Sequence, residues 1–151
     1  MRNPINTNTQ PGWTARFRAP VIAWVSVASQ NPKRGIVCVS DGGQLQLYAW
    51  DVQSGNLRLI TDQSGPVSQG AISADGRWLY YLHSETGDGI GHFFRVPFEG
   101  GAGHDLSPEL PPYISYHITE AASGAFYGFM AYNQYGYQMY VVDNISGGTP
   151  H

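Results

Sequence analysis

The chain has 151 residues, a net charge of −3 and a single lysine, Lys33, so it has no basic patch to hold nucleic acid or an anionic membrane surface. Charged residues make up only 13% of the chain, whereas glycine occurs 19 times and aromatic residues make up another 13%, which favours an all-β protein with many tight turns. The sequence has no run of eighteen apolar residues, no secretory signal at residues 1–6, and one cysteine, Cys38, which cannot form an internal disulfide. We therefore expect a cytoplasmic protein without a membrane span.

The amino-terminal residues are polar and show no periodicity. We expect residues 1–19 to form a loose arm. The alternative is a strap that adds an edge strand or docks on another domain, because Trp13 and Phe17 are costly to leave in water.

From Val21 onward, short β-prone runs alternate with turn residues. The first block predicts strands at 21–27, 35–40, 45–52 and 57–61. The second predicts strands at 67–73, 78–83 and 93–96 and a short one ending at 107, and the third predicts strands at 113–119, 125–132 and 138–143. Asp75-Gly76 predicts a hairpin, since glycine accepts positive φ and aspartate bonds to the local backbone.

The three blocks repeat with a period of 46 residues. The matching positions are Val21, Val67 and Tyr113 at the start, Tyr48, Phe94 and Tyr140 in the third strand, Gly55, Gly101 and Gly147 in the next turn, and Thr61 and Ser107 at the end of the fourth strand. A repeated four-stranded meander of this length is the unit of a β-propeller. We therefore predict an all-β partial β-propeller of about three four-stranded antiparallel blades, near 20–65, 66–111 and 112–151.

Large residues recur in the third strand of each block, and we expect them to fill the layers between the blades. They are Leu47, Phe93 and Met139, together with Tyr48, Phe94 and Tyr140.

The hairpin of the second block carries a recognisable motif. Ser-Ala-Asp-Gly-Arg-Trp-Leu-Tyr-Tyr at 73–81 resembles the Ser-x-Asp-Gly-(Lys/Arg) motif of TolB-type propeller blades, which also form the amino-terminal domain of the prolyl oligopeptidase family of serine peptidases. Residues 47–61 and 95–108 are similar to the other half of such a blade. The third repeat departs from the motif, because residues 120–124 replace the expected Asp-Gly turn.

This resemblance implies a non-catalytic propeller segment that gates or covers the active site of a separate, C-terminal α/β-hydrolase domain and restricts access to short peptides. The alternative is a TolB-like propeller that binds protein partners and has no enzymatic role. A metal-dependent lactonase propeller is disfavoured, because the predicted first strands carry no carboxylates.

No catalytic residue is predicted within these 151 residues. A hydrolase of the resembled family needs a Gly-x-Ser-x-Gly nucleophile motif, and the sequence has none. Ser68, in the stretch 65–70, has the wrong glycine spacing for that motif, and we interpret it as an ordinary strand residue.

Four candidate metal ligands lie within ten residues: His83, Glu85, Asp88 and His92. Their spacing matches no standard zinc or EF-hand pattern, so we predict a solvated loop, with no metal and no other cofactor.

Two further residues and the end of the chain carry expectations. Cys38 lies in a β-prone run and is predicted to be a buried, inert thiol. His117 falls in the predicted first strand of the third block, where a ligand-facing position in a central channel is the alternative to an ordinary strand residue. By the period, the last fourth strand would end near position 153, so we expect a propeller fragment whose open blade faces self-associate.

Overall fold

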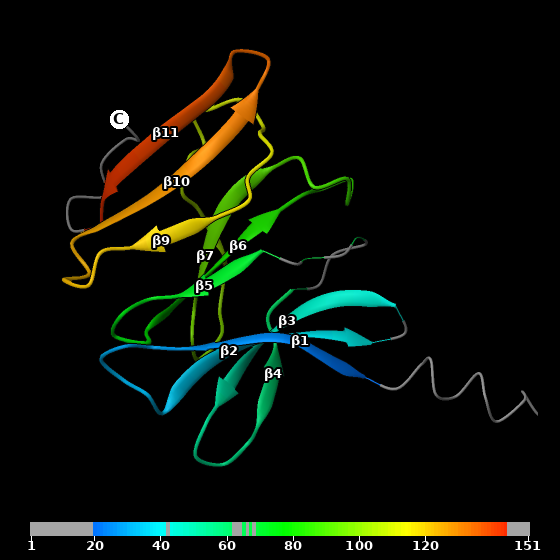
Figure 1. Cartoon of the computed structure of the whole chain (residues 1–151), viewed down its shortest axis with the longest axis vertical. Helices are drawn as coiled ribbons and strands as arrows, with labels where there is room; N and C mark the ends of the chain where they lie inside the picture. Colours follow the sequence, from blue (N-terminus) through cyan, green and yellow to red (C-terminus); the bar gives the residue numbers. More distant parts are fainter. Residues whose placement is uncertain (1–19, 42, 62–64, 66, 68, 145–151) are drawn as a thin grey trace, which may run out of the picture.

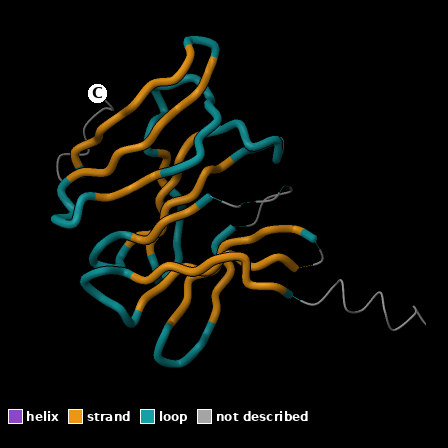
Figure 2. The backbone as a smooth tube through the Cα atoms, in the orientation of Figure 1, coloured by secondary structure: helices purple, strands orange, loops and turns teal. Residues whose placement is uncertain are grey.

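The computed structural model describes residues 20–41, 43–61, 65, 67 and 69–144, and these residues form three antiparallel sheets (Figure 1). They contain no helix, and therefore none that could cross a membrane. Figure 2 shows strands joined by turns and by longer loops in the described backbone. The prediction of an all-β partial propeller is confirmed.

Each sheet is a meander whose strands follow one another in chain order. The first sheet contains β1 (Val21–Val27), β2 (Arg34–Asp41), β3 (Gln44–Asp51) and β4 (Leu57–Leu59). The second contains β5 (Gly70–Ile72), β6 (Trp78–His83), β7 (His92–Pro97) and β8 (His104–Asp105). The third contains β9 (Ile118–Glu120), β10 (Phe126–Asn133) and β11 (Gly136–Asp143). The predicted arm at 1–19 lies outside the described residues.

The innermost strands of the second and third sheets are shorter than predicted. β5 covers only part of 67–73, and β9 begins at Ile118, whereas Tyr113 forms an isolated bridge with Gly91. In the outer half of each blade the 46-residue period holds, and Tyr48, Phe94 and Tyr140 all lie in third strands. Their cross-strand partners, Val37, Tyr81 and Phe129, are instead 44 (81 − 37) and 48 (129 − 81) residues apart, because the β6–β7 loop is longer than the other hairpin loops.

The predicted Asp-Gly hairpin joins β5 to β6. Gly76 has φ +75°, and the Asp75 carboxylate accepts hydrogen bonds from the Ser73 hydroxyl at 2.7 Å and the Arg77 backbone N–H at 2.8 Å. In the third sheet Gly124, with φ +72°, supplies the left-handed residue of the equivalent turn. A glycine therefore closes this turn without the preceding aspartate.

Apolar side chains fill both layers between neighbouring sheets. The layer between the first and second sheets includes Ile36, Leu47, Leu79 and Val96, and the layer between the second and third includes Tyr80, Phe93, Tyr113, Tyr127 and Phe129.

The prediction that third-strand residues fill these layers holds for Leu47 and Phe93, each 0% exposed. It is wrong for Met139, which is 83% exposed, because its side chain lies on the face of the third sheet that points away from the second. Tyr48, Phe94 and Tyr140 are half-buried.

Cys38 is fully buried in the first of these layers, as predicted. Its thiol lies 3.9 Å from the Val67 carbonyl oxygen, and burial raises the pKa of the thiol. We expect Cys38 in the native protein to react with Ellman's reagent at pH 8 roughly a thousandfold more slowly than in denaturant, because reaction requires a rare open state. Stoichiometric release of thionitrobenzoate within minutes, without denaturant, would contradict this burial.

Candidate functional site in the central cleft

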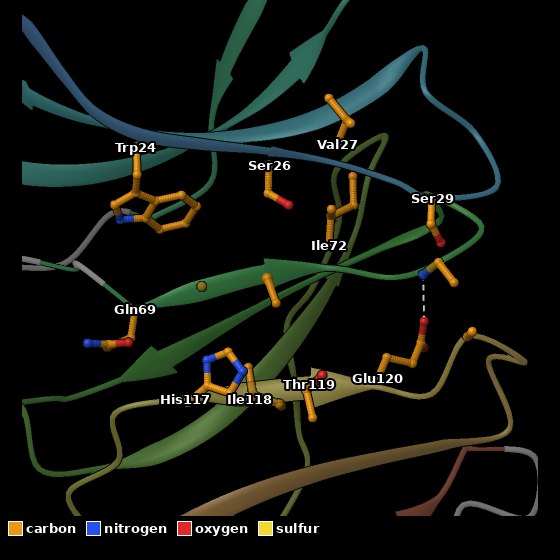
Figure 3. A pocket seen from close by; sticks show the side chains of 14 residues that line it. Trp24, Ser26, Val27, Ser29, Gln69, Ile72, His117, Ile118, Thr119 and Glu120 are labelled. Atoms are coloured by element: carbon orange, nitrogen blue, oxygen red, sulfur yellow. Dashed lines mark hydrogen bonds between the residues drawn. The ribbon is translucent and has the colours of Figure 1, made fainter.

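The innermost strands of the three sheets, β1, β5 and β9, border a cleft of about 620 Å³ (Figure 3). In Figure 3, Trp24 projects into the cleft from β1, and His117 approaches from the opposite wall, just before β9. Gln69 lies between them on the segment that leads into β5.

The sequence predicts that His117 lies in the first strand of the third block, at 113–119, and this prediction is wrong. The residue precedes β9, its side chain is exposed, and it lines the cleft. His117 therefore does face the central cleft, but from the loop that precedes β9 and not from a strand. The Ser115 hydroxyl donates to the His117 backbone carbonyl at 3.4 Å.

Glu120, at the end of β9, is the one carboxylate among the described residues that line the cleft, and it is engaged in holding the blades together. Its carboxylate accepts hydrogen bonds from the Ala74 backbone N–H at 2.5 Å, the Tyr80 hydroxyl at 2.9 Å and the Asn144 side-chain amide at 3.1 Å. Burial, and then the negative charge of Glu120, raise the pKa of Tyr80, which keeps its hydroxyl a proton donor. Glu120 therefore joins the second and third sheets.

A second chain of hydrogen bonds supports this junction. The Arg95 guanidinium donates to the Asn144 side-chain oxygen at 2.8 Å, and Asn144 also donates to the Gly124 carbonyl at 3.1 Å. The Arg95 guanidinium carbon lies 4.8 Å from the centre of the Trp78 ring. These contacts hold the Arg95 guanidinium of the second sheet against Asn144, which follows the third sheet.

The β1–β2 turn of the first sheet is hydrogen-bonded to the β5–β6 turn of the second sheet and to the β9–β10 turn of the third. The Gln30 backbone N–H donates to the Ala74 carbonyl at 2.8 Å, and its side-chain amide donates to the Ala122 carbonyl at 2.6 Å. The three inner turns are thus bonded to one another at one end of the cleft.

The remaining lining groups can hydrogen-bond without carrying a fixed charge. They are the hydroxyls of Ser26, Ser29 and Thr119, the Gln69 amide and the His117 imidazole, beside the flat apolar surface of Trp24. Such a set suits an extended, uncharged polypeptide backbone better than an ion. These groups can bind and orient an extended chain through hydrogen bonds and contact with the Trp24 ring.

The residues of the predicted solvated loop lie around a separate cavity of about 470 Å³, beside the β6–β7 loop. Nδ1 of His92 lies 2.8 Å from a carboxylate oxygen of Asp105, a partner that sequence spacing did not suggest. Asp88 accepts from the Ile90 backbone N–H and the Ser84 hydroxyl, each at 2.9 Å, and these bonds lower the pKa of Asp88. In the described part of the chain, no three His, Cys, Asp or Glu side chains converge as metal ligands would. The prediction that no metal binds stays a prediction.

The fold is shared with solved propeller structures, although no protein-family profile matches the sequence and no curated protein is similar to it. The chain is similar to the protein assigned as TolB in Agrobacterium tumefaciens, with a TM-score of 0.67 and 21% identity over 85% of this chain and 47% of that one. It is also similar to puromycin hydrolase (TM-score 0.64, 18% identity, 87% of this chain and 20% of that one) and to tricorn protease (0.62, 15%, 81% and 13%).

At these identities the likeness establishes the fold alone. The chain spans about half the length of the TolB structure and a smaller part of the other two. The resemblance to TolB-type blades that residues 73–81 suggest is therefore confirmed as a fold, and the described residues form a partial β-propeller.

Proposed function

We propose that this chain is a non-catalytic propeller segment whose central cleft admits extended peptides and gates the active site of an α/β-hydrolase domain outside residues 1–151. The observation that carries the proposal is the cleft itself. It is bordered by all three innermost strands, and Glu120, the one carboxylate that lines it within the described part of the chain, is already bonded. A cleft that binds peptide backbone without reacting with it can select which peptides reach the hydrolase domain.

The structural similarity to puromycin hydrolase and tricorn protease supports this proposal as analogy only, since the likeness is one of fold. The proposal includes a cytoplasmic location, with which the reduced, buried Cys38 is compatible.

A second candidate function is TolB-like binding of a protein partner without any link to hydrolysis. The inner edge of β1 favours it, because this strand has seven residues whereas β5 and β9 have three each. No described strand pairs with that edge, so its backbone groups can receive an extended segment of a partner.

The test combines binding with a search for cleavage. Short unstructured peptides are expected to quench Trp24 fluorescence, and the quenching is expected to disappear in Trp24→Phe and to weaken severalfold in His117→Ala, because both side chains line the cleft. A Trp50→Phe variant is the matched control, because Trp50 does not line the cleft.

Mass spectrometry of the same peptides is expected to show no cleavage, and a fluorophosphonate probe is expected to label no serine, because no nucleophile motif is present. Quenching that is unchanged in Trp24→Phe would refute the peptide-binding cleft. Labelling that is abolished by replacing one serine would refute the non-catalytic assignment.

A further inference from the structure

The outward face of the third sheet is apolar and uncovered by any described residue. Phe126, Tyr137, Met139 and Val141 are 48%, 70%, 83% and 51% exposed, and their cross-strand register places them on one side of β10 and β11. Isolated exposed apolar residues are ordinary, but a contiguous set across two strands marks a contact surface.

The equivalent positions in the other two sheets show what such a face contacts. Leu47 and Phe93 stand 46 residues apart in their third strands, as do Phe93 and Met139. Leu47 is fully buried against the second sheet and Phe93 against the third. Met139 therefore occupies a position that, in both preceding sheets, is covered by the next blade.

The outward face of the first sheet is also apolar and exposed, but it lies on the side of the blade that faces a preceding blade. Ile22, Val25 and Val27 of β1 are 64%, 52% and 45% exposed, and Leu59 of β4 is 46% exposed. By cross-strand register Val37, on this face, corresponds to Tyr81, which packs against the first sheet. This face of the first sheet therefore corresponds to the face by which the second sheet receives its preceding neighbour.

We propose that these two faces bind each other between two copies of the chain, so that the third sheet of each copy packs on the first sheet of the other. Each new contact would continue the blade-to-blade packing already present twice in the chain. The proposal goes beyond the proposed function because it states what covers the two outward faces.

Two copies are sufficient for closure. Each copy offers one face of each kind, so a two-fold axis along the propeller axis makes both new interfaces identical and leaves no face open. The ring has six blades, within the range in which propellers close, and it agrees with a chain that spans about half of the TolB structure. The cleft then becomes a channel lined by Trp24 and His117 from both copies.

Sedimentation velocity at micromolar concentration tests the proposal. The wild-type chain is expected to sediment as a single species of twice 16.5 kDa that does not grow with concentration. Met139→Lys and Val25→Glu, each placing a charge on one face, are each expected to shift the species to the monomer. Tyr135→Lys is the matched control, because Tyr135 is 71% exposed in the β10–β11 turn and outside both faces.

Mixing the two monomeric variants gives the sharper result. A mixed pair keeps one interface with both native faces and opposes lysine to glutamate at the other, so dimers are expected to reappear in the mixture alone. Circular dichroism of each variant establishes that it remains folded.

Two results would overturn the proposal. One is a folded wild-type monomer at all concentrations, which would assign the faces to blades from another polypeptide. The other is open-ended association that neither variant reduces and the mixture does not resolve into dimers. Either result leaves peptide quenching of Trp24 unaffected, so a failure of the ring and a failure of the proposed function are distinguishable.

Discussion

Replacing Glu120 with alanine is expected to lower the free energy of unfolding by about 3 kcal/mol, because the substitution leaves several donors without an acceptor. The Tyr80 hydroxyl is the costliest of these, since Tyr80 is only 1% exposed. The Ala74 backbone N–H and the Asn144 amide lose the same carboxylate. Urea unfolding followed by circular dichroism measures the change.

Two variants separate this effect from the loss of a negative charge. Glu99→Ala removes a carboxylate that pairs with Arg34 but is 74% exposed, and it is expected to cost less than about 0.5 kcal/mol. Glu120→Gln is expected to fall between the two, since its amide oxygen can still accept from Tyr80 while its NH₂ group opposes the Ala74 N–H.

A loss in Glu120→Ala no larger than that in Glu99→Ala would show that Glu120 does not join the second and third sheets. A loss of about 3 kcal/mol together with unchanged peptide quenching of Trp24 would separate its structural role from the binding of peptide.

The sequence was sufficient for the blade architecture because local chemistry dictates it. The Asp75-Gly76 turn and the β-prone run that follows it depend on residues close together in the chain, and β6 spans the predicted 78–83. The 46-residue period could be recognised in the sequence because third-strand residues such as Leu47 and Phe93 occupy equivalent places, each packed in the layer between its own blade and the next.

The candidate site was less predictable because its contacts join residues far apart in the chain. Glu120 was noted only as a departure from the Asp-Gly motif, yet it bonds to Ala74 and Tyr80 of the preceding blade. No local sequence pattern predicts a hydrogen bond between residues so far apart in the chain. A glutamate where the motif lacks its aspartate was the only available signal.

The burial of Met139 was misjudged for a related reason. Periodicity placed Met139 at the position that Leu47 and Phe93 occupy in the preceding blades, but whether a side chain at that position is buried depends on the neighbouring blade. A repeat reveals which face a residue lies on, and the next blade decides whether that face is covered.

Alkaline pH is expected to destabilise the fold more than any single substitution of an exposed residue. Burial is the main cause that raises the pKa of Tyr113 and of Tyr127 to about 12, and the two side chains are 0% and 4% exposed. In the unfolded chain tyrosine has a pKa of about 10. Between pH 10 and pH 12 the unfolded chain therefore binds fewer protons than the folded one, so stability falls as pH rises.

The size of this loss follows from the two-unit difference in pKa. Each buried tyrosine contributes stability that is fully present below pH 10 and falls by about 2–3 kcal/mol by pH 12. Tyr80, whose pKa is also raised, adds to the loss. Because whole domains are stable by only about 5–15 kcal/mol, we expect cooperative unfolding between pH 11 and pH 12, measured by circular dichroism and by tyrosinate absorbance at 295 nm.

Tyr127→Phe is the informative variant, because it keeps the packed ring and removes one ionisable hydroxyl. Its free energy of unfolding is expected to fall less steeply between pH 10 and pH 12 than that of the wild type, by about 2 kcal/mol over the interval. Tyr135→Phe, at a position 71% exposed, is expected to leave the pH profile unchanged. A free energy of unfolding that stays constant up to pH 11.5 would contradict this prediction, and so would identical pH profiles for the two variants. Either result would mean that the buried tyrosines do not lose their protons at a higher pH in the folded chain than in the unfolded chain.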